Sequence, residues 1–259
     1  MSTQLLFYNE VVPISAERHG NWHVRDLKDY SFTNKVNWVP LMAVEFLNAS
    51  SDFPIVFAGD EDTVMPVLLL GMRQDENVFL ASDGSWEGKY IPAFIRRYPF
   101  VFSLSEDGED FFLCIDETYP GFNQDAEGPA LIGEDGKASE YTDGVLNFLS
   151  EYQAEFQRTQ ALCKKLKDLN LLERKQVEAS LPSGEKMSLT DFYTVDRGRL
   201  TTLSSEAIVD LVRSGAYELI CYHLASLRNF NLLRDRTSDQ HLVGAEQETH
   251  ESEPAWSDT

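Results

Sequence analysis

Positive charge is scarce in this sequence. Lysine and arginine together number 22 against 43 aspartates and glutamates, which gives a formal net charge of −21 and a pI of about 4.5. A field of that sign repels the phosphate backbone of nucleic acids and the anionic surface of membranes. We therefore expect no nucleic-acid partner, which leaves a protein partner or a small ligand as the candidate classes.

Long apolar runs and cysteines are also scarce. No stretch approaches the about 18 consecutive apolar residues that a membrane-spanning helix needs, and the first ten residues lack the basic start of a secretory signal. The three cysteines, Cys114, Cys163 and Cys221, form no CxxC pair and are typical of reduced thiols. These absences predict a cytoplasmic protein without a transmembrane segment, with non-classical export to the surface as the alternative.

The familiar catalytic signatures are missing too. The sequence has no GxGxxG, Walker loop, GxSxG or HExxH motif. His19 and His23 are four residues apart, but Gly20 between them disfavours the helix that would let them share a metal. The acidic segments do not have the spacing of an EF-hand, and His223 lies in an apolar context that is typical of a core histidine. We expect no cofactor and no bound metal.

The apolar pattern predicts several short antiparallel strands. Residues 54–58, 64–72 and 77–81 follow one another with short connections and predict a three-stranded meander, with 67–70 as its covered central strand. Two further pairs of apolar runs surround polar, glycine-containing loops and predict β-hairpins. These pairs are 100–105 with 111–116, and 177–181 with 187–195.

Helices are expected mainly in the last half of the chain. A seam of apolar residues at spacings of three and four predicts a long helix over 143–169, capped by Thr142. Ser204 or Ser205 caps a second helix that ends near Gly215, and a third follows over 216–233. The predicted fold class is α+β: an antiparallel-rich sheet from residues 1–140 and 173–195, covered by the long helix and a C-terminal helical pair. We expect a single domain over 1–235 and a disordered acidic tail over 236–259.

The segment 83–100 concentrates the unusual residues. A turn at Gly84 precedes Trp86, and Pro92 and Pro99 bound a short helix in which Arg96 points away from the apolar face and Arg97 lies on its flank. One interpretation is an amphipathic helix with both arginines solvated. The other has Arg97 half-buried, where it binds an anionic ligand or a carboxylate, either Asp116 at the end of an apolar strand or Glu45 on a short helix over 42–48. The candidate binding residues are Trp86, Tyr90, Arg97, Asp116 and Glu45.

Motifs along the whole chain resemble those of the bacterial SapC family. They are Glu45-Phe46, Pro54 to Phe57, Pro66-Val67 with Gly71, Asn77 to Phe79, Gly84 with Trp86, Tyr90 to Pro92, Arg97 to Phe100, Ile115-Asp116, Phe192 to Val195 and Ala225 to Phe230. The similarity extends to about residue 235. The chain departs from the family pattern at Asp191 and Arg228, where glycine is common, and these departures concern local turn geometry.

The resemblance implies an association with bacterial surface layers. Relatives are also encoded near genes for outer-membrane receptors, and no established catalytic residues accompany the family. It is distinct from the transporter permease of the same name. The leading hypothesis is a non-enzymatic binding or accessory protein linked to surface-layer or outer-membrane uptake systems. The alternatives are an enzyme with a pocket near Trp86, Arg97 and Asp116, and a surface-layer component exported without a classical signal.

Overall fold

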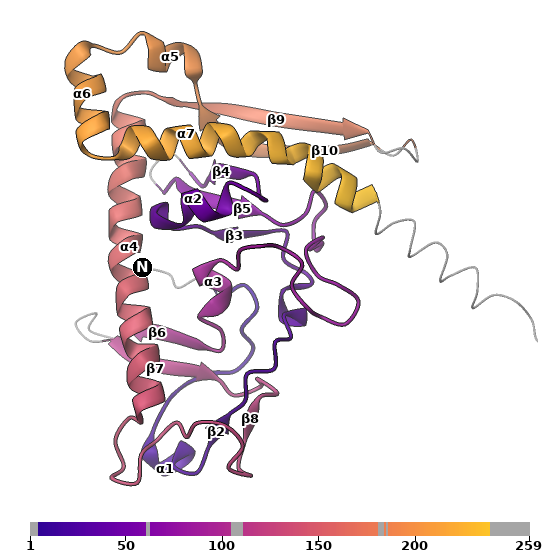
Figure 1. Cartoon of the computed structure of the whole chain (residues 1–259), viewed down its shortest axis with the longest axis vertical. Coiled ribbons are helices and arrows are strands. Elements are labelled where there is room, and N and C mark those ends of the chain that lie inside the picture. Colours follow the sequence, from indigo (N-terminus) through magenta and orange to yellow (C-terminus); the bar gives the residue numbers. More distant parts are fainter. Residues whose placement is uncertain (1–4, 61–62, 105–110, 181–183, 185, 239–259) are drawn as a thin grey trace, which may run out of the picture.

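Two antiparallel sheets lie one beyond the other along a single long helix, α4 (Glu140–Asp168), as Figure 1 shows. The structure is a computed structural model that describes residues 5–60, 63–104, 111–180, 184 and 186–238. The side chains of residues 179 and 180 are not described either. The predicted α+β class, with antiparallel sheets, a long helix and a C-terminal helical pair, is confirmed.

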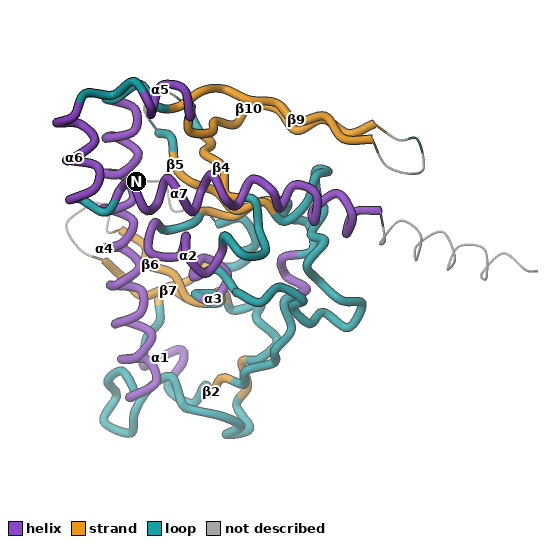
Figure 2. The backbone as a smooth tube through the Cα atoms, turned by 45° about the horizontal axis from the view of Figure 1, so that its top comes forward, coloured by secondary structure: helices purple, strands orange, loops and turns teal. Residues whose placement is uncertain are grey.

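The larger sheet has five strands in the order β3-β5-β4-β10-β9, with every neighbouring pair antiparallel. The strands are β3 (Trp38–Pro40), β5 (Met65–Leu69), β4 (Ile55–Ala58), β10 (Lys186–Val195) and β9 (Leu172–Ser180). The pairings β4–β5 and β9–β10 match two predicted connections, and β5 lies between two neighbours as expected. Strand β10 contacts β4 only at Phe192 and Tyr193, so most of the β9–β10 hairpin reaches beyond the sheet (Figure 2).

The predicted third strand of the meander, over 77–81, is wrong. The Asn77 side chain accepts a hydrogen bond from the Phe79 amide at 3.0 Å and donates one to Thr33 Oγ1 at 2.9 Å, so it holds this segment in a turn. The second neighbour of β5 is instead β3, which contains Pro40. Proline lacks the amide of a ladder bond, and an edge strand tolerates that loss.

The smaller sheet has the order β1-β7-β6 and is separate from the larger one, whereas the sequence predicted one sheet. Its strands are β1 (Val11–Pro13), β7 (Phe111–Asp116) and β6 (Phe100–Leu104), and the β6–β7 pairing confirms the predicted hairpin. A two-stranded ribbon joins β2 (His23–Val24) to β8 (Phe122–Asn123). The division arises because β6 and β7 pair with β1, so the meander and this hairpin share no ladder.

Helix α4 begins three residues earlier than predicted. Ser139, not Thr142, is the N-cap, and its hydroxyl accepts a hydrogen bond from the Thr142 amide. Thr142 is buried in the first turn, where its hydroxyl donates to the Leu131 carbonyl at 2.7 Å. The apolar seam faces the protein interior: Leu149 is buried in the smaller core, and Cys163 and Leu166 are buried in the larger one.

Short helical segments connect the strands of the first half. They are α1 (Ala16–His19), η1 (Ser31–Thr33), η2 (Ala43–Glu45), α2 (Phe46–Ala49) and α3 (Ala93–Arg96). Segment α3 follows Pro92, as expected, and buries Phe94 and Ile95. Arg96 is exposed and Arg97 is buried, which is the asymmetry that the helical wheel predicts.

The C-terminal helices cover the larger sheet. They are α5 (Arg197–Thr201), α6 (Ser205–Arg213), α7 (Ala216–Ser226) and η3 (Leu227–Asn229), and residues 230–238 continue as helix. Ser204 caps α6, and Gly215 adopts a φ of +76° between α6 and α7, where a side chain would strain the backbone. The folded chain thus reaches Ser238, three residues into the segment predicted as tail. Residues 239–259 lie outside the described residues.

The side chain of His223 completes the seam between β4 and β10. Extending the register of Phe192 with Ala58 and Tyr193 with Phe57 places Val195 opposite Ile55. The two do not bond directly, because the imidazole lies between them: Nε2 accepts from the Val195 amide at 3.0 Å and Nδ1 donates to the Ile55 carbonyl at 2.8 Å. Ser226 Oγ accepts from the Ile55 amide at 3.0 Å. The expectation of a hydrogen-bonded core histidine is confirmed.

Candidate functional site

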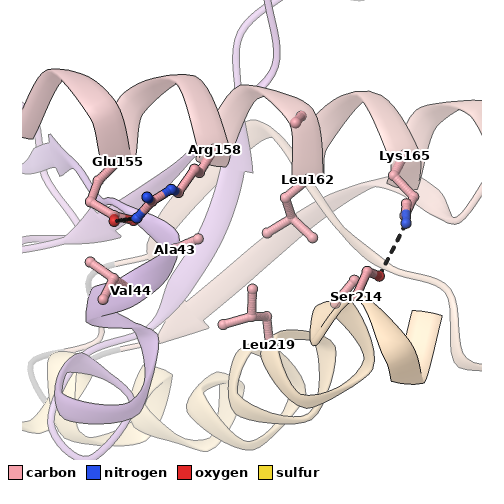
Figure 3. A pocket seen from close by; sticks show the side chains of 10 residues that line it. Ala43, Val44, Glu155, Arg158, Leu162, Lys165, Ser214 and Leu219 are labelled. Atoms are coloured by element: carbon pink, nitrogen blue, oxygen red, sulfur yellow. Dashed lines mark hydrogen bonds and ion pairs between the residues drawn. The ribbon is translucent and has the colours of Figure 1, made fainter. Parts of the chain in front are cut away.

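A groove of about 370 Å³ lies between α4, η2 and the start of α7 (Figure 3). Its apolar lining comes from Ala43, Val44, Ala161, Leu162, Ala216 and Leu219. These residues belong to three segments that are far apart in sequence, and each lies beside residues that pack into the larger core. We call this surface the helix groove. Its volume falls within the range of ligand pockets in proteins.

Two polar pairs flank the apolar part of the helix groove. Arg158 forms an ion pair with Glu155 on one side. On the other, Lys165 Nζ lies 3.0 Å from Ser214 Oγ and 2.8 Å from Asp210 Oδ2. Figure 3 shows Leu162 and Leu219 between these pairs, and Val44 beside the Glu155–Arg158 pair. An apolar centre with a polar rim is the usual composition of a protein interface.

Beside the helix groove, two large aliphatic side chains are open to solvent. Val44 is 63% exposed and Leu47 is 58% exposed, whereas Phe46 between them is fully buried. The spacing of three residues places Val44 and Leu47 on the same side of the η2–α2 segment. An exposed aliphatic pair next to an apolar groove is typical of a surface that another molecule covers.

Three of the residues predicted from sequence form one hydrogen-bonded chain. Trp86 Nε1 donates to the Tyr90 carbonyl at 2.9 Å, and the Tyr90 hydroxyl donates to Glu45 Oε1 at 2.7 Å. Glu45 also accepts from the amides of Ala93 at 2.7 Å and Met42 at 2.9 Å. Glu45 is 3% exposed, and burial raises the pKa of its carboxyl against the opposing effect of these hydrogen bonds. The carboxylate thus fixes η2 to the start of α3.

Arg97 lies in an aromatic surround. Its guanidinium is 4.0 Å from the ring centroid of Phe94, 5.3 Å from that of Tyr152 and 5.8 Å from that of Tyr8. A cation–π interaction of a desolvated guanidinium is worth about 2 kcal/mol, and the contact with Phe94 is the shortest of the three. The side chain was expected to be half-buried and is 7% exposed. Burial raises the pKa of the Glu45 carboxyl, and the charge of the neighbouring Arg96 only partly opposes that rise.

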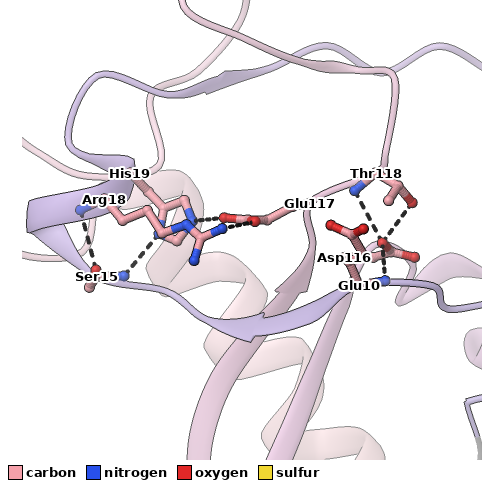
Figure 4. A network of polar contacts seen from close by, with 7 residues as sticks. All are labelled: Glu10, Ser15, Arg18, His19, Asp116, Glu117 and Thr118. Atoms are coloured by element: carbon pink, nitrogen blue, oxygen red, sulfur yellow. Dashed lines mark hydrogen bonds and ion pairs between the residues drawn. The ribbon is translucent and has the colours of Figure 1, made fainter.

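Asp116 ties the N-terminal segment to the end of β7 (Figure 4). It accepts hydrogen bonds from the amides of Asn9 at 2.8 Å and Glu10 at 3.1 Å, and from Thr118 Oγ1 at 2.7 Å. Burial acts to raise the pKa of Asp116, but these hydrogen bonds outweigh it and lower the pKa below the usual value. The contacts give Asp116 a structural role at this position.

A second polar network, around His19, was not expected from the sequence. His19 is fully buried, its Nδ1 accepts from the Ser15 amide at 3.1 Å, and Nε2 therefore donates to Glu117 Oε1 at 2.8 Å. Glu117 also pairs with Arg18 (Figure 4). Ser15, His19 and Glu117 are the residue types of a hydrolase triad, but the Ser15 hydroxyl accepts from the Arg18 amide and caps α1. No sequence motif predicts this network, because Glu117 lies 98 residues from His19 in the chain.

Metal ligation and membrane insertion can be examined over the part of the chain that the structure describes. Within it, no three His, Cys, Asp or Glu side chains are grouped so that they could hold a metal ion. Over the same residues, no helix combines the length and the apolar character needed to cross a bilayer.

The fold is an α+β arrangement of two antiparallel sheets on a shared helix, with an apolar groove on its helical side. The family model described as SapC matches residues 14–233. The chain therefore belongs to the SapC family, as the sequence motifs indicate. Searches of curated proteins and of solved structures find no match.

Proposed function

We propose that this chain is a non-enzymatic binding protein, and that a protein partner docks on the helix groove. The observation that carries the proposal is the exposure of Val44 and Leu47 beside that groove, at 63% and 58%. Their burial by a partner would remove apolar surface from water, at about 25 cal/mol for each Å². The charged rim would supply orientation rather than the main part of the affinity.

Membership of the SapC family supports a proposal for the setting of this binding. We infer an accessory role in surface-layer or outer-membrane uptake systems, carried out from the cytoplasm. The net charge of −21 supports a protein partner over nucleic acid, because a polyanion would be repelled. A surface-layer component exported by a non-classical route is the alternative, and fractionation of native cells separates the two by where the chain is recovered.

An enzyme acting near Trp86, Arg97 and Asp116 is the other alternative. The raised pKa of Glu45 favours it, because perturbed carboxylates gather at active sites. Against it, Glu45 and Asp116 each accept several hydrogen bonds from backbone amides, which use the lone pairs that a base needs. None of the five candidate residues is among those that line the helix groove.

Site-specific photocrosslinking in the native bacterium tests the proposal. A photoreactive phenylalanine analogue at Val44 should give a discrete adduct, whereas the same analogue at Tyr141, which is 36% exposed on the first turn of α4, should not. Val44→Asp or Leu47→Asp, combined with a photoreactive residue in place of Leu219, should abolish the adduct. Both substitutions should change the free energy of unfolding by no more than about 0.5 kcal/mol, because the sites are exposed. An adduct of equal yield from Tyr141, or one that survives both aspartates, would contradict the proposal.

A further inference from the structure

Strand β9 presents a long free backbone edge. It is the outermost strand of the five-stranded sheet, spans nine residues and pairs with β10 alone among the described strands. Arg199 covers its first residue, since Nη1 lies 3.4 Å from the Leu172 carbonyl oxygen. From Glu173 onward, this outer edge has no partner strand among the described strands. Unpaired amides and carbonyls of this kind are a template for another strand.

The exposed face of β9 has a charge pattern that changes sign about its centre. Arg174, Gln176 and Glu178 alternate along the strand and are all exposed, so they share one face. The positive Arg174 lies two residues before Gln176, and the negative Glu178 lies two residues after it. When a second β9 runs antiparallel to the first, its own pattern is reversed and presents the opposite charge at each position.

We propose that two copies of this chain associate through antiparallel pairing of their β9 strands, with Gln176 opposite Gln176 of the partner subunit. Arg174 then lies opposite Glu178 of the partner subunit, and the two-fold axis creates that pair twice. Opposite charges that face each other across two strands are stabilising, and like charges are destabilising. The two five-stranded sheets become one continuous sheet across the interface.

The charges select this register over its neighbours. In two antiparallel strands related by a two-fold axis perpendicular to the sheet, the axis passes between two copies of the same residue. Each register is therefore defined by the residue that lies opposite its own copy, which we call the centre. A centre at Arg174, Lys175 or Glu178 places that charge opposite its own copy. A centre at Val177 forms no pair of opposite charges. Gln176 is the centre that gives two opposite-charge pairs and no like-charge pair.

The contacts already present at β9 are compatible with this arrangement. Arg174 forms an ion pair with Asp191 on β10, and Gln176 Nε2 donates to Glu178 at 2.8 Å. In the dimer, the Arg174 guanidinium would lie between Asp191 and Glu178 of the partner subunit, and its several donors can serve both carboxylates. A single pair of strands is a small interface, so the association belongs to the weak, transient class.

Disulfide trapping detects a weak association and reports its register. In a Cys221→Ser background, which removes the exposed native thiol, Gln176→Cys places two thiols opposite each other. The Cα atoms of such a pair are about 4.5–5.5 Å apart, a spacing that a disulfide spans. In the same background, Glu178→Cys is the matched control, since the two copies of residue 178 are offset by four residues, or about 13 Å. On mild oxidation, the first variant should give a covalent dimer of twice the 29.4 kDa chain, and the second should remain monomeric.

Charge reversal tests the pairing of Arg174 with Glu178. In the Gln176→Cys chain, Arg174→Glu alone and Glu178→Arg alone should each reduce the dimer yield several-fold, because each places like charges opposite. An equimolar mixture of the two should restore the yield, since one copy then carries two glutamates and the other two arginines. Lys164→Glu on α4, which makes the same change in net charge as Arg174→Glu, should leave the yield unchanged. Equal trapping at residues 176 and 178, no trapping at either, or a mixture that fails to recover overturns the proposal.

Discussion

The imidazole of His223 should make the stability of this protein depend on pH between neutrality and about pH 4. The side chain is fully exposed to water only when the chain unfolds, where its pKa is about 6.5. In the folded protein, burial lowers the pKa of His223 to about 4, and the charge of Arg197 acts in the same direction. A proton on Nε2 would also face the Val195 amide, which is a donor. The neutral form is therefore the one that the fold accepts.

The sign and size of the effect follow from linkage. Because the folded-state pKa is depressed, the contribution of His223 is complete above pH 6.5 and is lost as the pH falls toward 4. A gap of about 2.5 pKa units corresponds to about 3 kcal/mol once both states are protonated. By pH 5 about 2 kcal/mol of this should already be gone. Glu45 acts in the opposite direction, since its raised pKa makes acidification favourable for the fold.

A difference between variants isolates the histidine from the other titrating groups. In His223→Gln, the amide can donate to the Ile55 carbonyl and accept from the Val195 amide, but it does not titrate. Urea unfolding at pH 7 and pH 5 should show that wild type loses about 2 kcal/mol more than this variant does. The half-exposed His23, whose Nδ1 lies 3.3 Å from the Asn21 carbonyl oxygen, supplies the control His23→Gln, which should keep the wild-type pH dependence. Parallel pH profiles for wild type and His223→Gln would refute the reasoning.

Three further predictions concern stability. Arg97→Ala should lower the free energy of unfolding by about 2–4 kcal/mol, because the buried guanidinium packs on the Phe94 ring at 4.0 Å. The control Arg96→Ala should lower it by about 0.5 kcal/mol, and equal effects of the two variants in chemical denaturation would contradict this. Asp116→Asn should lower the free energy of unfolding by about 1–3 kcal/mol at pH 7. The loss should be smaller in acid, because the pKa of Asp116 is depressed and the stabilisation by the wild-type carboxylate disappears as the pH falls through that pKa. A loss that does not change with pH would show that the ionised carboxylate is not the stabilising form. Ending the chain after Ser238 should leave the melting temperature unchanged, and a large loss would mean that residues 239–259 contribute to the fold. Arg236→Ala should lower the melting temperature by a few degrees, because Arg236 forms an ion pair with Glu87 at 2.6 Å and its guanidinium lies over the Phe79 ring.

Local patterns predicted most of the secondary structure, because they report local physics. The spacing of apolar residues identified α4, and apolar runs around polar loops identified the hairpins β6–β7 and β9–β10. The errors arose where side chains decide the backbone. The Asn77 carboxamide holds residues 77–79 in a turn, although their apolar pattern predicts a strand. Ser139, rather than Thr142, is the N-cap of α4. Neither outcome follows from hydrophobic periodicity.

The candidate site was harder to predict, since its parts meet only in the folded chain. The spacing of residues 91–98 predicted that Arg97 is less exposed than Arg96, although Arg97 was expected to be half-buried and is 7% exposed. The hydrogen bond from Tyr90 to Glu45 crosses 45 residues, and the helix groove joins η2, α4 and α7 from three separate parts of the chain. Long-range contacts of this kind leave no periodic signal in one sequence. An exposed aliphatic residue such as Val44 also cannot be distinguished from a core residue by its type alone.

The predicted residues and the helix groove are nevertheless connected, and the connection is η2. Glu45 ends this turn and accepts hydrogen bonds from the Met42 and Ala93 amides, while the Ala43 amide donates to Thr159 Oγ1 of α4 at 2.8 Å. Val44 lies between these anchored residues, so the backbone cannot turn it inward without breaking a buried hydrogen bond. An unpaired buried group of that kind costs about 1–3 kcal/mol. The buried carboxylate therefore has a structural role at this position: it holds an aliphatic side chain out in water, on the surface where we propose that a partner docks.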